Sequence, residues 1–385
     1  MEPSARASAV LRTASVLGTL VLLVGCGARG DAAGGAEGGG AGGTDGQQEP
    51  GGQDGSAATD PGRPGDVATG LEVPWGLAFL PDGSALVAQR DSAEVVRVSP
   101  DGSVAGVGTV EGTAPDGEGG LLGLAVDPGF PGEPYVYAYH TTDSDNRISR
   151  LEYDPENGDG GFGETEVILD GIPSASHHNG GRIGFGPDGL LYVGTGDAGR
   201  EGLSQDTDSL GGKILRITTD GDPAPDNPFG NPVHSYGHRN VQGLAWDDEG
   251  NLYATEFGQN EFDEVNLIEP GGNYGWPEVE GAGGGDEYVD PLLTWRPAEA
   301  SPSGAAVAGG SLWVAALRGE RLWEVPLTGD GGVGEPVDRY QGEYGRLRTV
   351  VAAPGGDELW LTTSDLDGVG EPAEGDDRVL RVPLE

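Results

Sequence analysis

Residues 242–258 read QGLAWDDEGNLYATEFG, in which two short apolar segments flank an Asp/Glu/Gly turn. Two alternating segments joined by such a turn are typical of a β-hairpin. Five further stretches share this form and begin at Trp75, Leu122, Gly181, Ser303 and Leu347. Their spacing of roughly 45 to 60 residues fits propeller blades with their connecting loops.

Several of these hairpins are followed by a third apolar segment, such as KILRITTDG from Lys213. No amphipathic helix of convincing length interrupts the series, and 74 Gly and 28 Pro are typical of many turns between short strands. We therefore predict an all-β fold, a six-bladed β-propeller. A β-sandwich or another blade count is the alternative, although regular reuse of one motif argues against the sandwich. The first strand of the domain could complete the last blade.

The N-terminus is typical of an exported protein. Two arginines precede an apolar run at residues 16–24, which is followed by Gly25 and Cys26. This pattern predicts a signal peptide at residues 1–25, and LVGC resembles a bacterial lipobox with lipidation at Cys26. An ordinary signal peptide with an incidental cysteine is the alternative. Residues 26–65 are rich in Gly, Ala, Asp and Gln, which predicts a disordered Gly-rich linker before a domain at residues 66–385.

Charge and cysteine content exclude two classes of protein. The formal net charge is -43, so nucleic acid is not an expected partner. A single cysteine excludes a disulfide scaffold. Lys213 is the only lysine among 21 basic residues, so arginine supplies nearly all the positive charge.

Histidine is scarce, and four of the five histidines fall in two polar loops. His177 and His178 open the third repeat, and His234 and His238 precede the fourth. A histidine in such a loop is a candidate general base because imidazole titrates near neutral pH. A zinc site is an alternative, but the spacing matches no familiar ligand pattern. The GTGDAG string at residues 194–199 fits a dinucleotide fingerprint, yet the polar loop after it predicts no helix to bind a pyrophosphate.

Arginines recur in the loops between repeats. They are Arg239 beside Asn240, Arg318, and the pair Arg346 and Arg348. Side chains two residues apart on a strand point the same way, so the pair could hold an anionic ligand. The alternative is that each arginine pairs with a local carboxylate.

Several strings in these loops together resemble the soluble pyrroloquinoline quinone (PQQ)-dependent glucose and aldose sugar dehydrogenases, the glucose/sorbosone dehydrogenase family. The resemblance runs from about Leu71 to the C-terminus. The strings that carry it are DGEGGLLG (116–123), HHNGGRIGFGPDGLLYVGTGDAG (177–199), GGKILRI (211–217), GHRNVQGLAW (237–246), TEFGQNEFDEVNLIEPGGNYGWP (255–277) and GRLRTV (345–350). The family fold is a six-bladed propeller, in agreement with the repeat count.

The resemblance implies a role for each matching residue. His178 matches the base that removes the C1 hydroxyl proton of the sugar while hydride passes to the quinone. Arg239 and Asn240 match residues that bind the quinone oxygens and stabilise the developing negative charge. Arg346 and Arg348 match the pair that binds cofactor carboxylates.

The resemblance also implies a metal and a substrate side. Gly258 and Gln259 fall where backbone carbonyls hold the calcium ion that binds PQQ, and calcium prefers oxygen ligands. Trp295 falls in a stretch that lines the substrate side.

Three positions depart from the family pattern. Glu118 stands where the glucose-oxidising members have glutamine, and His177 stands where they have aspartate. Arg318 replaces the usual cofactor-binding lysine, and its forked shape could alter the affinity for PQQ. The first two changes favour a broader aldose range over glucose alone.

The resulting hypothesis is an extracytoplasmic, lipid-anchored dehydrogenase that uses PQQ and Ca²⁺ to oxidise aldoses to lactones. Its electron acceptor could lie in the membrane, which the chain would touch only through its anchor. A non-catalytic binding propeller is the alternative from another class. A calcium-dependent lactonase propeller would need several acidic side chains converging on the axis, and the loops contain no such set.

Overall fold

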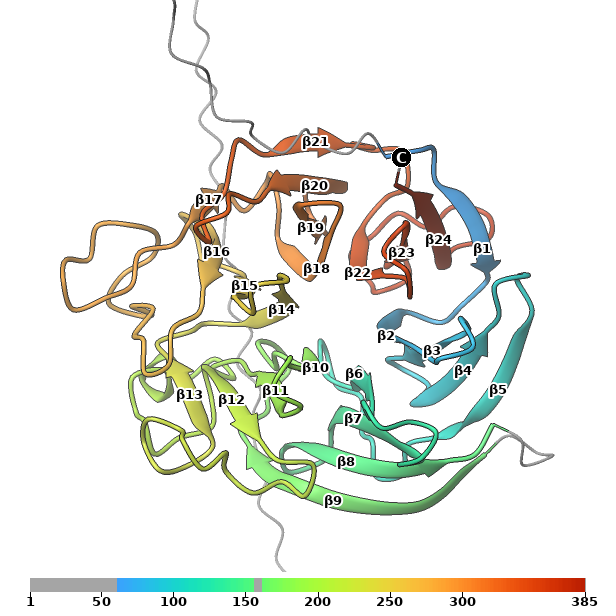
Figure 1. Ribbon diagram of the computed structural model, residues 1–385, viewed down its shortest axis with the longest axis horizontal. Helices are drawn as coiled ribbons and strands as arrows, with labels where there is room; N and C mark the ends of the chain where they lie inside the picture. The colour runs from blue at the N-terminus through green and yellow to red at the C-terminus, as the bar shows by residue number, and fades with distance from the viewer. Residues whose placement is uncertain (1–60, 156–160, 385) are drawn as a thin grey trace, which may run out of the picture. The chain divides into compact units, whose positions relative to one another are not determined.

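The structure is a computed structural model that describes residues 61–155 and 161–384. Within them, 24 strands form six four-stranded antiparallel sheets around a common axis (Figure 1). The prediction of an all-β, six-bladed propeller is confirmed. The signal peptide, Cys26 and linker residues 27–60 lie outside the described residues. In the described part, no helix has the length and apolar character needed to cross a membrane.

Blades 1 to 5 each take four consecutive strands from the axis outward. Blade 1 contains β2 (Pro74–Phe79), β3 (Ala85–Gln89), β4 (Glu94–Val98) and β5 (Val104–Thr109). Blade 2 contains β6 (Leu121–Val126), β7 (Tyr135–Thr141), β8 (Asn146–Tyr153) and β9 (Phe162–Ile172). Blade 3 contains β10 (Ile183–Phe185), β11 (Leu191–Gly194), β12 (Lys213–Ile217) and β13 (Val233–Tyr236). Blade 4 contains β14 (Val241–Trp246), β15 (Leu252–Glu256), β16 (Asp263–Leu267) and β17 (Leu293–Trp295). Blade 5 contains β18 (Pro302–Ala308), β19 (Ser311–Ala316), β20 (Arg321–Pro326) and β21 (Val337–Arg339).

Blade 6 joins the two ends of the domain and closes the ring. It contains β22 (Leu347–Ala352), β23 (Glu358–Thr363) and β24 (Arg378–Pro383), with β1 (Gly65–Thr69) as its outer strand. Closure extends beyond β1, because the Gly62 N–H donates to the Pro383 carbonyl at 2.8 Å. Residues 61–65, which the sequence assigns to the linker, are therefore already attached to the last blade.

The recurring glycine of the repeat lies where adjacent inner strands approach each other most closely. An added Cβ at Gly76 would overlap the Leu122 carbonyl oxygen, and one at Gly123 would overlap the Gly181 carbonyl oxygen. Gly243 and Gly304 meet backbone atoms of the following blade in the same way. The glycines thus permit inner strands to pack backbone to backbone.

Blades 3 and 6 carry larger residues at this position. The strand registers align Arg182 and Thr349 with the four glycines. The Arg182 Nη2–H donates to Thr349 Oγ1 at 3.0 Å, and the Arg182 guanidinium lies 4.4 Å from the centre of the Trp75 ring. These side chains fill the space that the glycines leave along the axis.

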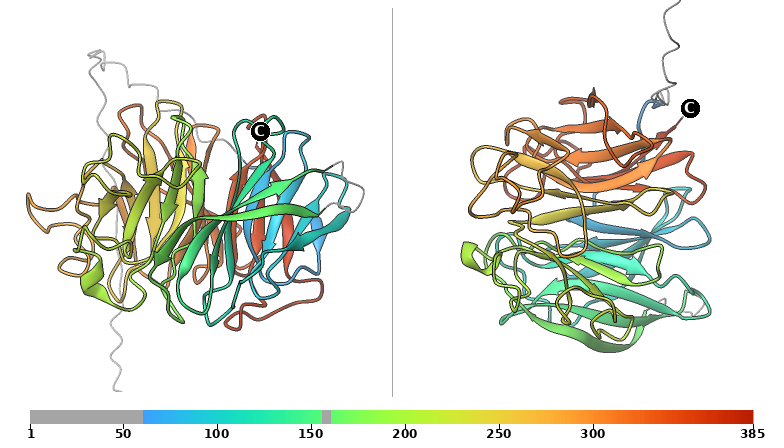
Figure 2. Two further views of the ribbon diagram at one scale, coloured as in Figure 1. Left: turned by 90° about the horizontal axis from the view of Figure 1, so that it is seen from below. Right: turned by 60° about the vertical axis from the view of Figure 1, so that its left-hand side comes forward.

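Strand direction brings the candidate site residues to one face. The strands in each blade run antiparallel, so loops that enter an inner strand share a face with loops between second and third strands (Figure 2). Glu118, His177, His178, Arg239, Asn240, Arg346 and Arg348 lie at the entry to inner strands, and Gly258, Gln259 and Arg318 lie in the second kind of loop. Residues from five blades therefore surround one mouth of the propeller.

The close approach at the axis makes a direct prediction. Gly123→Ala should lower the free energy of unfolding by at least about 2 kcal/mol, because the new methyl group has no space beside Gly181. Gly106→Ala in β5 is the matched control, since no atom lies within 4 Å of its added Cβ. Urea denaturation gives the free energy of unfolding of both variants. Equal stability of the two would contradict a steric requirement for glycine at the axis.

Candidate functional site

A buried hydrogen-bonded chain holds His178 at the mouth. His178 Nδ1 lies 2.7 Å from Asp197 Oδ1, and the Trp276 Nε1–H donates to Asp197 Oδ2 at 2.9 Å. Asp197 is fully buried, whereas the His178 side chain is 15% exposed. Asp197 follows β11 and Trp276 lies in the long loop before β17, so residues of two blades orient one imidazole.

The charge on Asp197 decides which ring nitrogen of His178 carries the proton. Burial acts to raise the pKa of Asp197, but hydrogen bonds from His178, Trp276 and Gly199 outweigh it and the pKa is lowered. An ionised carboxylate only accepts hydrogen bonds, so His178 Nδ1 carries the proton. The lone pair of Nε2 then remains available to a substrate.

The backbone at His178 is held in an unusual conformation. Its φ is 55°, in the left-handed region that residues other than glycine rarely adopt. Glu118 Oε2 accepts the His178 N–H at 2.9 Å, and the Ala198 N–H donates to the His178 carbonyl at 3.1 Å. His177 is exposed and meets the His178 ring edge-to-face, with centroids 4.6 Å apart. The structure thus places Glu118 and His177 directly beside His178.

Arg239 and Asn240 present free donors at the same mouth. Arg239 Nε and Asn240 Nδ2 are buried and have no hydrogen-bond partner among the described residues. One other polar atom of each side chain is held: Asn240 Oδ1 accepts the Gly180 N–H at 2.9 Å, and Arg239 Nη1 donates to the Phe257 carbonyl at 3.2 Å. Buried donors without partners are costly, so they mark a place for an acceptor group.

Arg346 and Arg348 point to one carboxylate, as residues two apart on a strand should. Asp367 Oδ2 accepts from Arg346 Nη2 at 2.9 Å and from Arg348 Nη2 at 3.2 Å. The pair therefore does have a local carboxylate, which was the alternative to an anionic ligand. Burial lowers the pKa of Arg348 to about 10, although Asp367 opposes the shift.

The loop of Gly258 and Gln259 directs its amides at carboxylates. The Gly258 N–H donates to Asp263 Oδ1 at 3.0 Å, and the Gln259 N–H donates to Glu280 Oε1 at 2.8 Å. No described residue donates a hydrogen bond to the carbonyl oxygen of Gly258 or Gln259. These oxygens could coordinate a hard cation. The described residues contain no cluster of three or more His, Cys, Asp or Glu with metal-binding geometry.

The side chains of Arg318 and Trp295, which the sequence places in the site, make no hydrogen bond with the site residues described above. Arg318 is exposed after β19 and has no partner among the described residues. Trp295, predicted on the substrate side, is 5% exposed in β17 and stacks on Trp323 at 5.2 Å in the core of blades 4 and 5. Its ring contacts are those of a core residue, and its buried Nε1–H has no hydrogen-bond partner among the described residues.

The remaining loop histidines also differ in their surroundings. His238 is fully buried between Glu256 and Ser235, at 2.8 Å from each, and stacks on Tyr274. The Glu256 carboxylate also accepts the Arg239 N–H. His238 therefore helps to position Arg239 through their shared contact with Glu256. His234 lies at the other end of the same segment, away from the mouth.

Sequence reasoning missed three residues of this site. Asp197 lies within the GTGDAG string, which is followed by a 3₁₀ helix, η1 (Glu201–Leu203), of only three residues, so no helix N-terminus is there to bind a pyrophosphate. Trp276 and Asp367 carry no distinctive local pattern. The one available signal for Asp197 was its place in the polar loop that follows the strand β11.

The arginine pair predicts a large effect at Asp367. Asp367→Asn should cost about 3–5 kcal/mol of unfolding free energy, because two guanidinium groups lose their buried counter-charge. Asp220→Asn, at a pair with Arg150 whose carboxylate is 72% exposed, should cost under about 1 kcal/mol.

The effect at Asp367 should depend on pH in a defined direction. Burial acts to raise the pKa of Asp367, but Arg348 and Arg346 hold it below 3.8. The stability from the ionised carboxylate is present above that value and is lost as the pH falls through the lower folded-state pKa. The difference between wild type and Asp367→Asn in urea denaturation should therefore shrink at acid pH. A constant difference would contradict the ionic origin.

Comparison with known proteins identifies the family. The family model for glucose/sorbosone dehydrogenases matches residues 71–370. An uncharacterised protein of Synechocystis is 36% identical, with 63% of this chain and 68% of that protein covered. Quinoprotein glucose dehydrogenase B of Acinetobacter calcoaceticus is 35% identical over 56% of this chain and 52% of its own length. The PQQ-bound aldose sugar dehydrogenase of Streptomyces coelicolor superimposes with a TM-score of 0.82 at 55% identity, covering 86% of this chain and 100% of that one. The chain belongs to the glucose/sorbosone dehydrogenase family.

Proposed function

We propose that the protein is a PQQ- and calcium-dependent dehydrogenase that oxidises aldoses at C1 to lactones. The observation that supports this most directly is the pair of buried, partnerless donors on Arg239 and Asn240 beside an oriented His178. Two donors fixed at one mouth fit the oxygens of an ortho-quinone. The solved relative with PQQ bound and the quinoprotein relative add support for the cofactor.

His178 has the geometry of a general base. Its Nε2 would take the proton of the C1 hydroxyl, while Asp197 stabilises the imidazolium that forms. PQQ, when bound, supplies the acceptor for the hydride that leaves C1. Arg239 would hold the quinone oxygen on which negative charge develops. Glu118 and His177, which lie beside the base, would contact the sugar.

Further residues would hold the cofactor in place. Arg346 and Arg348 would bind PQQ carboxylates, in exchange for part of their pairing with Asp367. Arg318 is exposed and free for the same task. The carbonyl oxygens of Gly258 and Gln259 would hold Ca²⁺, which would act as a Lewis acid on a quinone carbonyl.

The cellular setting of this proposal comes from the sequence. A lipid anchor at Cys26 would hold the domain outside the cytoplasm, on the outer face of the cell membrane. Electrons could then pass to a membrane-bound acceptor.

The proposal predicts a difference between the adjacent histidines. His178→Ala should reduce dye-linked aldose oxidation by the PQQ- and Ca²⁺-loaded protein by about 10²-fold or more, the usual contribution of a general base. His177→Ala is the matched control and should retain turnover with an altered KM, because His177 is exposed and is not joined to Asp197.

Cofactor binding is measured separately from turnover. The absorbance change on titration with PQQ should be retained in His178→Ala and weakened in Asn240→Ala, which removes a free donor. Bound PQQ without oxidation of any aldose would refute the sugar assignment. Absence of PQQ binding in the presence of Ca²⁺ would refute the quinoprotein assignment.

A further inference from the structure

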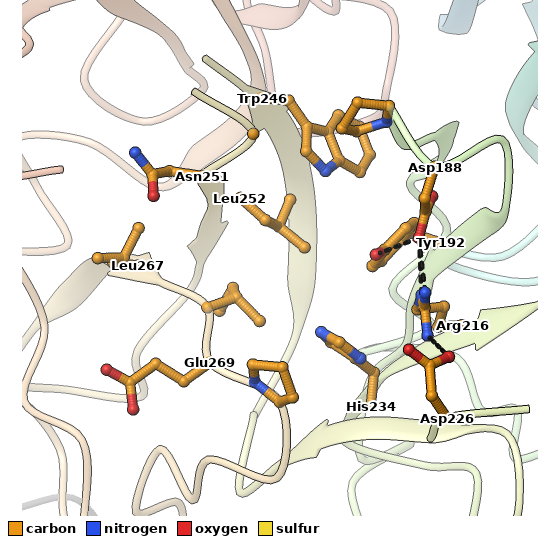
Figure 3. A pocket seen from close by; sticks show the side chains of 14 residues that line it. Asp188, Tyr192, Arg216, Asp226, His234, Trp246, Asn251, Leu252, Leu267 and Glu269 are labelled. Carbon is orange, nitrogen blue, oxygen red and sulfur yellow. Dashed lines mark hydrogen bonds and ion pairs between the residues drawn. The ribbon is translucent and has the colours of Figure 1, made fainter. Parts of the chain in front are cut away.

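A second cleft lies on the face opposite the candidate active site, between blades 3 and 4 (Figure 3). Its volume is about 490 Å³, within the range of small-molecule sites. It is formed by the turns between the first and second strands of the two blades. The ends of β12, β13 and β16 that lie on this face complete it. These segments are at the far end of the strands from His178 and Arg239, so the cleft shares no residue with the mouth.

Aromatic and aliphatic side chains form its walls. Trp246, at the end of β14, meets the Tyr192 ring edge-to-face at 5.3 Å. Leu252, Leu267 and Ile268 line the same cleft. Trp246 also borders the hollow at the end of the propeller axis, so its indole separates two cavities and is only partly covered by protein.

The charges around the cleft disfavour an anion. The lining of the cleft contains three carboxylates, those of Asp188, Asp226 and Glu269, and one cationic side chain, Arg216. Two of these carboxylates are already paired, because Arg216 Nη2 lies 2.7 Å from Asp188 Oδ2 and Arg216 Nη1 lies 2.6 Å from Asp226 Oδ1. An incoming cation would therefore find only the exposed Glu269 carboxylate unpaired. A neutral ligand with hydrogen-bonding groups fits this balance best.

His234 provides an independent sign of a missing partner. It is 93% buried (7% exposed), its side chain lines the cleft, and its Nδ1 has no hydrogen-bond partner among the described residues. Burial, followed by the charge of Arg216, lowers the pKa of His234 to about 4. A neutral imidazole has one donor and one acceptor, which suits a hydroxyl group.

We propose that this cleft is a binding site for a neutral saccharide, separate from the catalytic mouth. The indole of Trp246 would pack against the C–H face of a sugar ring. Hydroxyl groups, which both donate and accept, would bond to the His234 imidazole, the Asn251 amide oxygen and the Glu269 carboxylate. The Asn251 Nδ2–H is already engaged by Asp247 Oδ2 at 2.7 Å, which leaves the Asn251 oxygen free to accept.

This inference does not depend on the proposed function. A saccharide held here would be bound without being oxidised, because the cleft contains no paired base and hydride acceptor. The two sites lie at opposite ends of the blades, so each can be removed without altering the residues of the other.

Maltose is the probe, and saturation-transfer NMR with the full, PQQ-free chain is the measurement. We expect maltose to bind wild type and to lose about tenfold in affinity in Trp246→Ala, through loss of the aromatic contact. Glu269→Arg places a bulky cation at the exposed rim and should weaken binding without disturbing the core. Glu249→Arg is the matched control, because it makes the same charge change at an exposed residue that does not line the cleft.

A catalytic-face variant separates the two sites. Binding retained in His178→Ala but weakened in Trp246→Ala and Glu269→Arg would support the cleft, as would maltose density in the cleft beside Trp246 and His234 in a soaked crystal. Absence of maltose binding, or binding that only His178→Ala weakens, would overturn the proposal. Binding of choline but not maltose would overturn it in favour of a cation site.

Discussion

The close approach of inner strands at the axis is the constraint on which the rest of the structure depends. At Gly76, Gly123, Gly243 and Gly304 a single added carbon would overlap the backbone of the following blade. At these four of the six equivalent positions, adjacent sheets can approach each other only because no side chain is present. β1 pairs with β24 as the outer strand of blade 6 and so joins the two ends of the domain. The glycine that recurs in the sequence repeat reflects this geometric requirement.

The exceptions to the glycine pattern connect the scaffold with the site. Arg182 and Thr349 occupy two of the six equivalent positions, and Arg348 donates to Gln242 Oε1 at 3.2 Å across the axis. These polar side chains form the floor beneath the mouth that contains His178. A substitution at the axis would therefore disturb both ring closure and the position of the candidate cofactor-binding arginines.

The fold was largely predictable from the sequence because it repeats a local pattern. Each hairpin is defined by neighbouring residues, and the predicted common direction of Arg346 and Arg348 holds although Arg346 lies just before β22. Asp197 and Trp276 were not predictable, because 79 residues separate them and only the folded ring brings them together. Trp295 shows the converse: a position in a site-bearing segment does not reveal that the side chain turns into the core.

The distribution of positive charge argues that the mouth is built for a ligand rather than for stability alone. The chain has a net charge of -43, yet Arg182 and Arg348 are both buried near the axis, and burial lowers the pKa of Arg182 to about 9. Asp367 pairs with Arg346 and Arg348, but no carboxylate of the described residues pairs with Arg182. Apolar side chains would fill the same space at lower cost. A polyanionic ligand bound at the mouth would stabilise this buried excess of cationic groups. The proposed binding of a tricarboxylated cofactor accounts for the excess in this way.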